Sequence, residues 1–121
     1  MLCFMKSTMS CMGSGLFIFA KCLALLTMKD ITLKDIFEAR GRIASMALKT
    51  PLMLSEILSE LTGKDIYLKL ENLQTTGSFK IRGAANALLS LSPDQKKCGV
   101  ITFSTGNHGR AVAFVARRLG L

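Results

Sequence analysis

The sequence predicts an α/β fold in which helices flank a parallel sheet. Two short apolar runs, residues 66–70 and 99–103, have the composition of β-strands, and each is followed by a segment with apolar residues at helical spacing. The order strand, helix, strand, helix implies a right-handed crossover between parallel strands. Because two strands alone leave both edges of a sheet uncovered, we expect a truncated part of a larger α/β architecture.

The segment before the first strand is expected to contain two helices. Thr32 and Asp35 fit the S/T-x-x-D/E capping pattern, and apolar residues follow at helical spacing as far as Ala47. The Thr50-Pro51 pair ends this helix, because a residue before proline is pushed toward extended geometry. Ser55 is placed to cap a second, short helix, which Gly63 ends in a left-handed conformation.

The second half of the chain supplies the two strand-to-helix connections. After the strand at 66–70, the polar loop 72–77 leads to a helix that Ser78 caps and Pro93 closes. Residues 99–103 are apolar throughout, as expected of a strand buried on both faces. The loop 104–107 then leads into a helix over residues 108–119, which ends before Gly120.

Residues 1–27 differ in composition from the rest of the chain. They contain four of the seven methionines, three of the four cysteines and no acidic residue. Three interpretations remain open: a translated segment upstream of a true start at Met28, a targeting or membrane-associating extension, and a structural arm. We expect residues 1–27 to be a non-native or targeting-like extension and residues 28–121 to be an incomplete domain.

Composition argues against several classes of function. The net charge of +8 is spread out, since basic residues are adjacent only at 96–97 and 117–118 and acidic residues are interspersed, so we expect no nucleic-acid binding. The apolar run 15–26 is interrupted by Lys21 and is shorter than the about 20 residues that cross a bilayer, so no membrane span is expected. The cysteine spacing indicates neither a metal site nor a disulfide framework, which favours a reducing, cytoplasmic location.

Lys80 is the first candidate for chemistry. It lies in the first turn of a predicted helix, between Phe79 and Ile81. The positive end of the helix dipole and the apolar neighbours would both favour the neutral amine, which is the form that condenses with an aldehyde. The alternative is an ordinary solvated lysine.

The loop at residues 104–109, with the sequence STGNHG, is the second candidate. It is rich in hydroxyl groups and lies at a helix N-terminus, where free backbone N–H groups can hold an anion such as a carboxylate. A plain N-cap made by Ser104, Thr105 or Asn107 explains the same residues. His108, the only histidine, fits either a satisfied position at the helix start or a ligand contact.

Taken together, GSFKIRGA at 77–84 and STGNHG at 104–109 resemble the fold-type II enzymes that depend on pyridoxal phosphate (PLP), with a tryptophan synthase β-like architecture. The two motifs stand in the right order and about 25 residues apart, and the resemblance extends from about Thr32 to Leu121. Ile-Arg-Gly-Ala after the lysine, and Gly-Asn-His in the second loop, are similar to threonine dehydratase and serine racemase. Cysteine and threonine synthases instead usually have Asp-Arg after the lysine.

The resemblance implies a role for each residue of the two motifs. Lys80 would carry PLP as a Schiff base, Phe79 would lie against one face of the pyridine ring, and Asn107 would hydrogen-bond the phenolic oxygen of the ring. The carboxylate of the amino-acid substrate would be surrounded by residues of the second loop: Ser104, Thr105, Gly106 and His108. No role is assigned to Arg82 or Asn86.

The implied reaction is a β-elimination, the dehydration and deamination of a hydroxy amino acid such as threonine or serine to a 2-oxo acid and ammonia. A dehydratase acting on a related substrate, such as one in hydroxyectoine breakdown, is also compatible. Serine racemase-type activity is an alternative, although Thr105 stands where those racemases have a serine. The family's glycine-rich phosphate loop is absent from these residues, so we expect the chain alone to be inactive, and a non-catalytic fragment is the remaining alternative. A full-length relative would act as a homo-oligomer.

Overall fold

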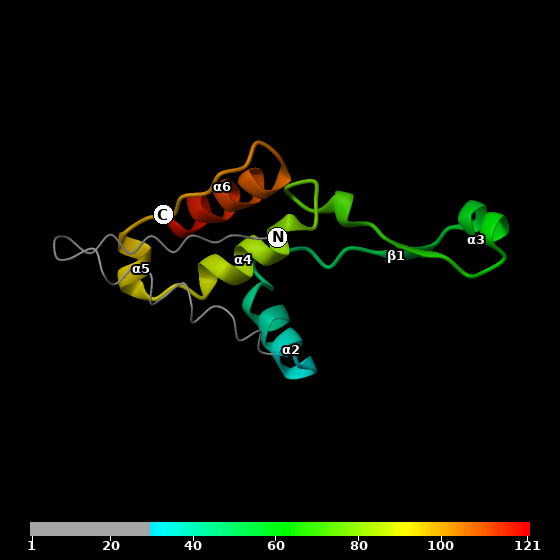
Figure 1. Ribbon diagram of the computed structural model, residues 1–121, viewed down its shortest axis with the longest axis horizontal. Helices are drawn as coiled ribbons and strands as arrows, with labels where there is room; N and C mark the ends of the chain where they lie inside the picture. The colour runs from blue at the N-terminus through cyan, green and yellow to red at the C-terminus, as the bar shows by residue number, and fades with distance from the viewer. Residues whose placement is uncertain (1–29) are drawn as a thin grey trace.

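The computed structural model of this protein describes residues 30–121, and the predictions made for residues 1–27 lie outside the described residues. No helix within the described range combines the length and apolar character that crossing a bilayer requires. The elements, drawn in Figure 1, are in chain order α2 (Leu33–Arg42), β1 (Leu52–Leu54), α3 (Glu56–Thr62), β2 (Tyr67–Lys69), the 3-10 helix η1 (Glu71–Leu73), α4 (Lys80–Leu89), α5 (Pro93–Lys97) and α6 (Asn107–Leu119).

The hydrophobic core lies between α4 and α6, which pack side by side and run in the same direction (Figure 1). Half of the residues that the two helices bury are alanines, whose small side chains allow helix backbones to approach closely. Ile43, from the turn after α2, is also buried in this cluster. The residues that the two helices bury are Ile81, Ala84, Ala85 and Leu88 from α4 and Ala111, Val112, Val115 and Ala116 from α6.

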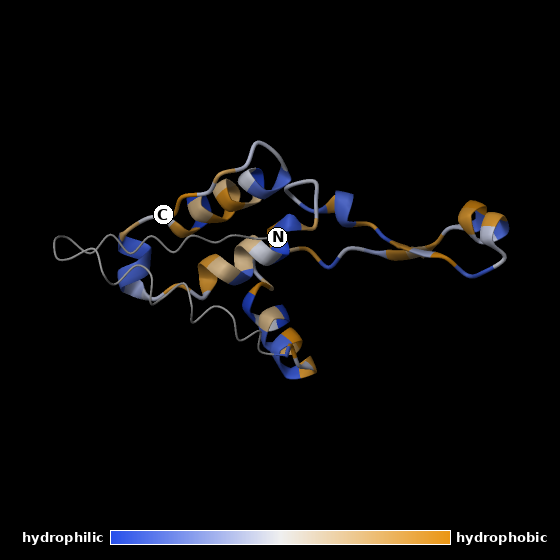
Figure 2. Ribbon diagram, viewed as in Figure 1, coloured by the Kyte–Doolittle hydropathy of each residue, from blue (hydrophilic) through white to orange (hydrophobic). Residues whose placement is uncertain are grey.

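The two strands form an antiparallel arm that reaches away from the helices, with α3 at its tip (Figure 1). Leu52 pairs with Lys69, Met53 with Leu68 and Leu54 with Tyr67. Every residue of both strands is exposed, and orange segments of the ribbon in Figure 2 mark the apolar residues of the arm. The arm is therefore held by its backbone hydrogen bonds and by its base, and not by burial of either face.

The predicted parallel pairing is not observed within residues 30–121. The strand expected at 66–70 forms as β2, but its partner is β1, which was not predicted. Residues 99–103 form no strand, Gly99 has a left-handed φ of +70°, and Ile101 is 81% exposed. A strand needs a neighbouring backbone to satisfy its N–H and C=O groups, and no strand of the described part lies beside these residues. The β-branched composition of residues 99–103 was therefore not enough to predict a strand.

The helix predictions were better. The capping box of Thr32 and Asp35, the Ser55 cap and the left-handed Gly63 are all confirmed. The first helix ends at Arg42, earlier than Ala47, and continues as turns. Helix α5 was missed, although Ser92 and Gln95 form a second capping box around Pro93 at its first position. Helix α4 ends at Leu89, before Pro93 is reached, so Pro93 marks the start of α5 and not the end of α4.

Replacing Leu88 by Ala tests the α4–α6 core. Leu88 is fully buried, so we expect the variant to lose about 3 kcal/mol of unfolding free energy through the cavity it creates. Urea denaturation followed by circular dichroism measures this loss. Leu61→Ala on the exposed face of α3 is the control and should change the value by no more than about 0.5 kcal/mol. Equal effects of the two substitutions would contradict the assignment of the core.

Candidate functional site

Lys80 is the first residue of α4, as the sequence predicted, and its side chain is half-buried. Its Nζ lies 4.8 Å from the centroid of the Phe79 ring, a cation–π contact. Phe79 occupies the N-cap position and is 57% exposed. An amine and a flat, accessible aromatic face are therefore neighbours at the start of this helix.

The loop before Lys80 is tightly folded. Gly77 adopts φ +72°, a left-handed conformation that glycine accepts without strain, and its N–H donates to Gln74 O at 2.7 Å. The buried Thr76 hydroxyl donates to Ser78 O at 3.5 Å. Ser78 was predicted to cap α4, but Phe79 takes that position and Ser78 Oγ has no hydrogen-bond partner although it is buried. An unpaired buried hydroxyl is uncommon and indicates a missing partner.

The second loop precedes α6. Ser104, Thr105 and Gly106 are exposed, and Ser104 Oγ accepts a hydrogen bond from Gly106 N at 3.3 Å. Asn107 is the first residue of α6 and is exposed, and His108 follows as a half-buried residue. Because Gly106 is the N-cap, the helix has no side-chain cap, which differs from the capping alternative considered for Ser104, Thr105 and Asn107.

Gly109 is the residue that lets this loop fold back on the helix. A Cβ atom at position 109 would lie 2.5 Å from the carbonyl oxygen of Ser104, closer than real Cβ contacts allow. Gly109 is the last residue of the STGNHG motif, and the sequence alone suggested no role for it. The position of Gly109 in the first turn of a helix, just after a hydroxyl-rich loop, was the feature of the sequence that could have indicated a close approach of the backbone.

The structure brings the two loops together. Both α4 and α6 begin at the same end of the helix pair (Figure 1). A Cβ atom at Gly77 would lie 3.7 Å from Nη1 of Arg110, so a residue of the first turn of α6 contacts the loop that precedes Lys80. The roles predicted for Lys80, Phe79 and Asn107 stay predictions, but their helices start side by side.

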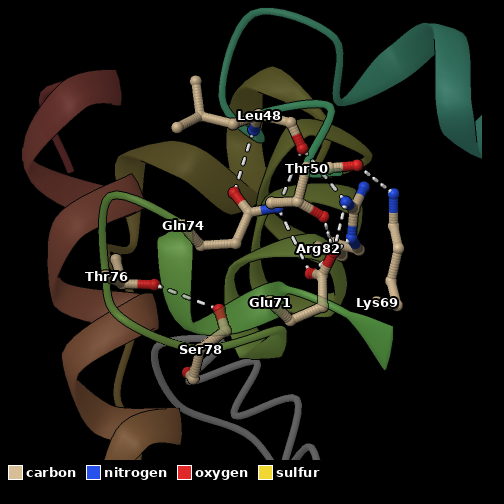
Figure 3. A network of polar contacts seen from close by, with 8 residues as sticks. All are labelled: Leu48, Thr50, Lys69, Glu71, Gln74, Thr76, Ser78 and Arg82. Atoms are coloured by element: carbon tan, nitrogen blue, oxygen red, sulfur yellow. Dashed lines mark hydrogen bonds and ion pairs between the residues drawn. The ribbon is translucent and has the colours of Figure 1, made fainter. Parts of the chain in front are cut away.

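An ion pair fixes the start of α4 to two earlier stretches of the chain. Arg82 donates through Nε and Nη2 to the two carboxylate oxygens of Glu71, each at 2.8 Å, and Nη2 also donates to Leu48 O at 3.0 Å (Figure 3). Thr50 Oγ1 donates to the same carboxylate, and Lys69 Nζ donates to Thr50 O. This bidentate pair explains Arg82, for which the sequence suggested no role.

Gln74 completes this network. Its Oε1 accepts from Leu48 N at 2.9 Å, and its Nε2 donates to Leu48 O at 2.8 Å and to Glu71 at 3.2 Å (Figure 3). A second long-range bond, from Arg42 Nη1 to Asn86 Oδ1, joins α2 to α4 and explains Asn86. Partners 44 residues apart leave no local signal in the sequence.

The network shifts the pKa values of Glu71 and Arg82. The hydrogen bond from Arg82 lowers the pKa of Glu71 to about 2 against the opposing effect of burial, with smaller contributions from Thr50 and Gln74 in the same direction. The same hydrogen bond raises the pKa of Arg82. Both groups are therefore charged throughout the neutral range. Within residues 30–121, no three His, Cys, Asp or Glu side chains gather to hold a metal ion.

Known proteins with similar sequences and structures are PLP-dependent enzymes and their relatives. A family model described as pyridoxal-phosphate dependent enzyme matches residues 43–121. The chain is 50% identical over 93 residues to a putative threonine dehydratase of Sinorhizobium fredii, covering 77% of this chain and 28% of that protein. It is 49% identical over 90 residues to the serine racemase of Dictyostelium discoideum, covering 74% and 28%. The structure of maize serine racemase superposes with a TM-score of 0.69 at 42% identity, covering 74% and 28%.

These matches confirm the predicted fold class as that of the fold-type II PLP enzymes, although the described residues do not form its parallel sheet. The chain spans about a quarter to a third of the length of the relatives that it matches.

Replacing Glu71 by Gln should destabilise the chain by about 1.5 kcal/mol at pH 6, because it leaves Arg82 without its counter-charge at a partly solvated position. The pKa of Glu71 is depressed in the folded state from 4.5 to about 2, so its stabilisation is complete above about pH 4.5 and is lost as the pH falls toward 2. The difference from wild type in urea denaturation should therefore shrink between pH 6 and pH 3.

Glu60→Gln is the matched control for this experiment, since it removes an exposed carboxylate from α3. It should change stability by no more than about 0.5 kcal/mol at pH 6. A difference between wild type and Glu71→Gln that stays constant from pH 6 to pH 3 would show that the carboxylate charge is not what stabilises the loop.

Gly109→Ala should destabilise the chain by about 2 kcal/mol, because the new methyl group overlaps the Ser104 carbonyl and the loop must move. Gly83→Ala is the control. Gly83 lies inside α4, and apart from the backbone of its own helix no atom lies within 4 Å of its Cβ position, so the substitution should stabilise the chain by about 0.5 kcal/mol. Thermal unfolding gives both values, and the same sign for the two variants would refute the close contact at Gly109.

Proposed function

This chain belongs to the family of pyridoxal-phosphate dependent enzymes, and on that premise we propose that it forms the lysine-bearing part of an ammonia-lyase. The whole enzyme would convert a hydroxy amino acid such as threonine or serine into a 2-oxo acid and ammonia. The relatives named threonine dehydratase and L-threonine ammonia-lyase, each 50% identical to this chain, support this activity.

One observation supports the proposal above all: Lys80 begins a helix whose N-terminal end lies beside the N-terminal end of α6. The residues present fit PLP. The exposed ring of Phe79 offers a flat apolar surface next to the amine, and the unpartnered hydroxyl of Ser78 offers a polar contact. PLP bound at Lys80 would supply the electron sink for the reaction.

The chain's own residues then have distinct tasks. The Lys80 amine would remove the proton from the substrate Cα, and Phe79 would keep water from one side of the ring. Asn107, at the start of α6, would donate a hydrogen bond to the phenolic oxygen. The substrate carboxylate would be held by the N-terminal end of α6 and the loop before it, that is by Ser104, Thr105, Gly106 and His108.

Racemisation is the second candidate, because the serine racemase of Dictyostelium discoideum is 49% identical to this chain. A racemase needs a second acid or base on the opposite face of the substrate, and Thr105 is the hydroxyl residue at the position in question. The products distinguish the candidates: 2-oxo acid and ammonia for the lyase, the opposite enantiomer for the racemase.

The chain alone is expected to turn over little substrate, because residues that bind the phosphate of PLP contribute much of its affinity and the glycine-rich loop lies outside this sequence. The whole protein would act on a small amino acid in the cytoplasm as a homo-oligomer.

The test is to label the chain with PLP, reduce with borohydride and map the modified lysine by mass spectrometry. We expect most of the label on Lys80, because its amine lies beside the Phe79 ring at the start of α4. Lys80→Ala should remove that label and the associated long-wavelength absorption of bound PLP. Lys64→Ala, at an exposed lysine outside the helix pair, should change neither. Label spread evenly over the exposed lysines would refute the proposal.

A further inference from the structure

The direction of the Lys80 amine depends on the backbone that carries it. None of the ion pairs within residues 30–121 includes Lys80, and its amine contacts the Phe79 ring, with Nζ 4.8 Å from the ring centroid. The ring is itself 57% exposed, so little packing restrains it. Because the two side chains rest on each other, the backbone of residues 79 and 80 sets their common orientation.

That backbone belongs to a segment, residues 74–82, which we call the lysine loop, and the two ends of this loop have the same partners. Gln74 Nε2, at one end, donates to Leu48 O at 2.8 Å and to Glu71 Oε2 at 3.2 Å (Figure 3). Arg82, at the other end, donates to the same Leu48 O at 3.0 Å and to both oxygens of the Glu71 carboxylate at 2.8 Å. Two acceptors that each bind both ends hold those ends at a fixed separation.

The interior of the lysine loop is constrained as well. Gly77 N–H donates to Gln74 O at 2.7 Å, and Gly77 has the left-handed φ of +72° that this turn needs. Gln74 is 4% exposed and Thr76 is 2% exposed, so water competes little for the hydrogen bonds there. Arg82 N–H donates to Phe79 O at 3.0 Å, at the start of α4. The path of the chain between the two ends is therefore fixed too.

We propose that Gln74 and Arg82 are positioning residues for Lys80. The partners that the two residues share fix the lysine loop, and the loop fixes the direction of the amine. The part of this inference that concerns PLP rests on the proposed function. In the condensation with the PLP aldehyde, which forms a C=N bond and releases water, an amine already held in one direction reacts faster, because less orientation has to be gained on the way.

A positioning role differs from a purely structural one in what it changes. If Arg82 only stabilised the fold, its loss would affect Lys80 in proportion to the stability lost. A positioning role changes the direction of the amine in molecules that are still folded. Two residues outside the lysine loop provide the comparison: Leu88, which is buried in the core, and Arg42, which ties α2 to α4 through Asn86.

The first measurement needs no PLP. The hydrogens of the Lys80 ε-methylene adjoin Nζ and lie near the face of the Phe79 ring, so the ring current should shift their nuclear magnetic resonance upfield of that of the exposed Lys64. In Arg82→Gln and Gln74→Ala we expect this resonance to move toward that of Lys64, while circular dichroism shows that the helices remain.

The second measurement uses PLP and borohydride as described above, and compares the label on Lys80 with the label on Lys64. Arg82→Gln should lower this ratio about tenfold, because a reactive group that loses its orientation loses rate. Arg82→Lys keeps the positive charge but not the planar fork that bonds Glu71 and Leu48 together, so it should lower the ratio less. It carries the test if Arg82→Gln does not fold.

Arg42→Gln is the matched control, since it is the same substitution at another arginine that tethers α4. It should leave the resonance and the label ratio at their wild-type values, and so should Leu88→Ala at a temperature where it is folded, although it costs more stability. A resonance or a label ratio that stays at the wild-type value in folded Arg82→Gln would overturn the inference. So would equal changes in Arg82→Gln and Leu88→Ala, because the effect would then follow stability.

The two proposals fail in different ways. Label on Lys80 that does not respond to Arg82→Gln refutes the positioning role and leaves the ammonia-lyase proposal in place. Label that falls elsewhere than on Lys80 in the wild-type chain refutes the ammonia-lyase proposal. The ε-methylene resonance then decides the positioning role, because it is measured without PLP.

Discussion

The packing of α4 against α6 is the contact on which the rest of the structure depends. Ala84, Ala85, Ala111 and Ala116 are all buried in the cluster that the two helices form, and such small side chains allow helices to pack closely. Because the helices run in the same direction, their N-terminal ends lie together (Figure 1). The two motifs are thereby brought to one place, although an intervening helix and an extended segment separate them in the sequence.

The polar network around Glu71 sets the position of the loop before Lys80, and its value is geometric more than energetic. Compared with two apolar residues in the same place, a partly solvated ion pair gains little stability, because desolvation offsets much of the attraction; removal of one partner is costlier, because the other charge is left uncompensated. What the pair does is connect three separate stretches of chain, at Leu48, Glu71 and Arg82, through hydrogen bonds with fixed directions. A loop tethered in this way presents the next residues to α6 in one conformation.

The features that the sequence predicted are those set by local chemistry. The caps at Thr32 and Ser55, the left-handed Gly63 and the helix after Asn107 depend on residues within one turn. Pairing of strands depends on which distant segment is available, and the apolar run 99–103 could not reveal that it lacked one in the described residues. Likewise, the partner of Arg82 lies 11 residues away on another element. The GSFKIRGA motif therefore could not indicate that Arg82 forms an ion pair.

Arg82 and Arg110 show how the same side chain acquires opposite roles from its surroundings. Arg82 lies 2.8 Å from the carboxylate of Glu71, and this ion pair balances its charge and holds the loop. Arg110 stands at the positive end of a helix, beside a glycine whose missing side chain leaves room for the guanidinium. None of the ion pairs within residues 30–121 includes Arg110, so its charge adds a positive potential at the start of α6, beside the loop that holds Gly77. The positive charge of Arg82 is thus balanced by Glu71, whereas that of Arg110 stands at the end of the helix pair where both loops meet.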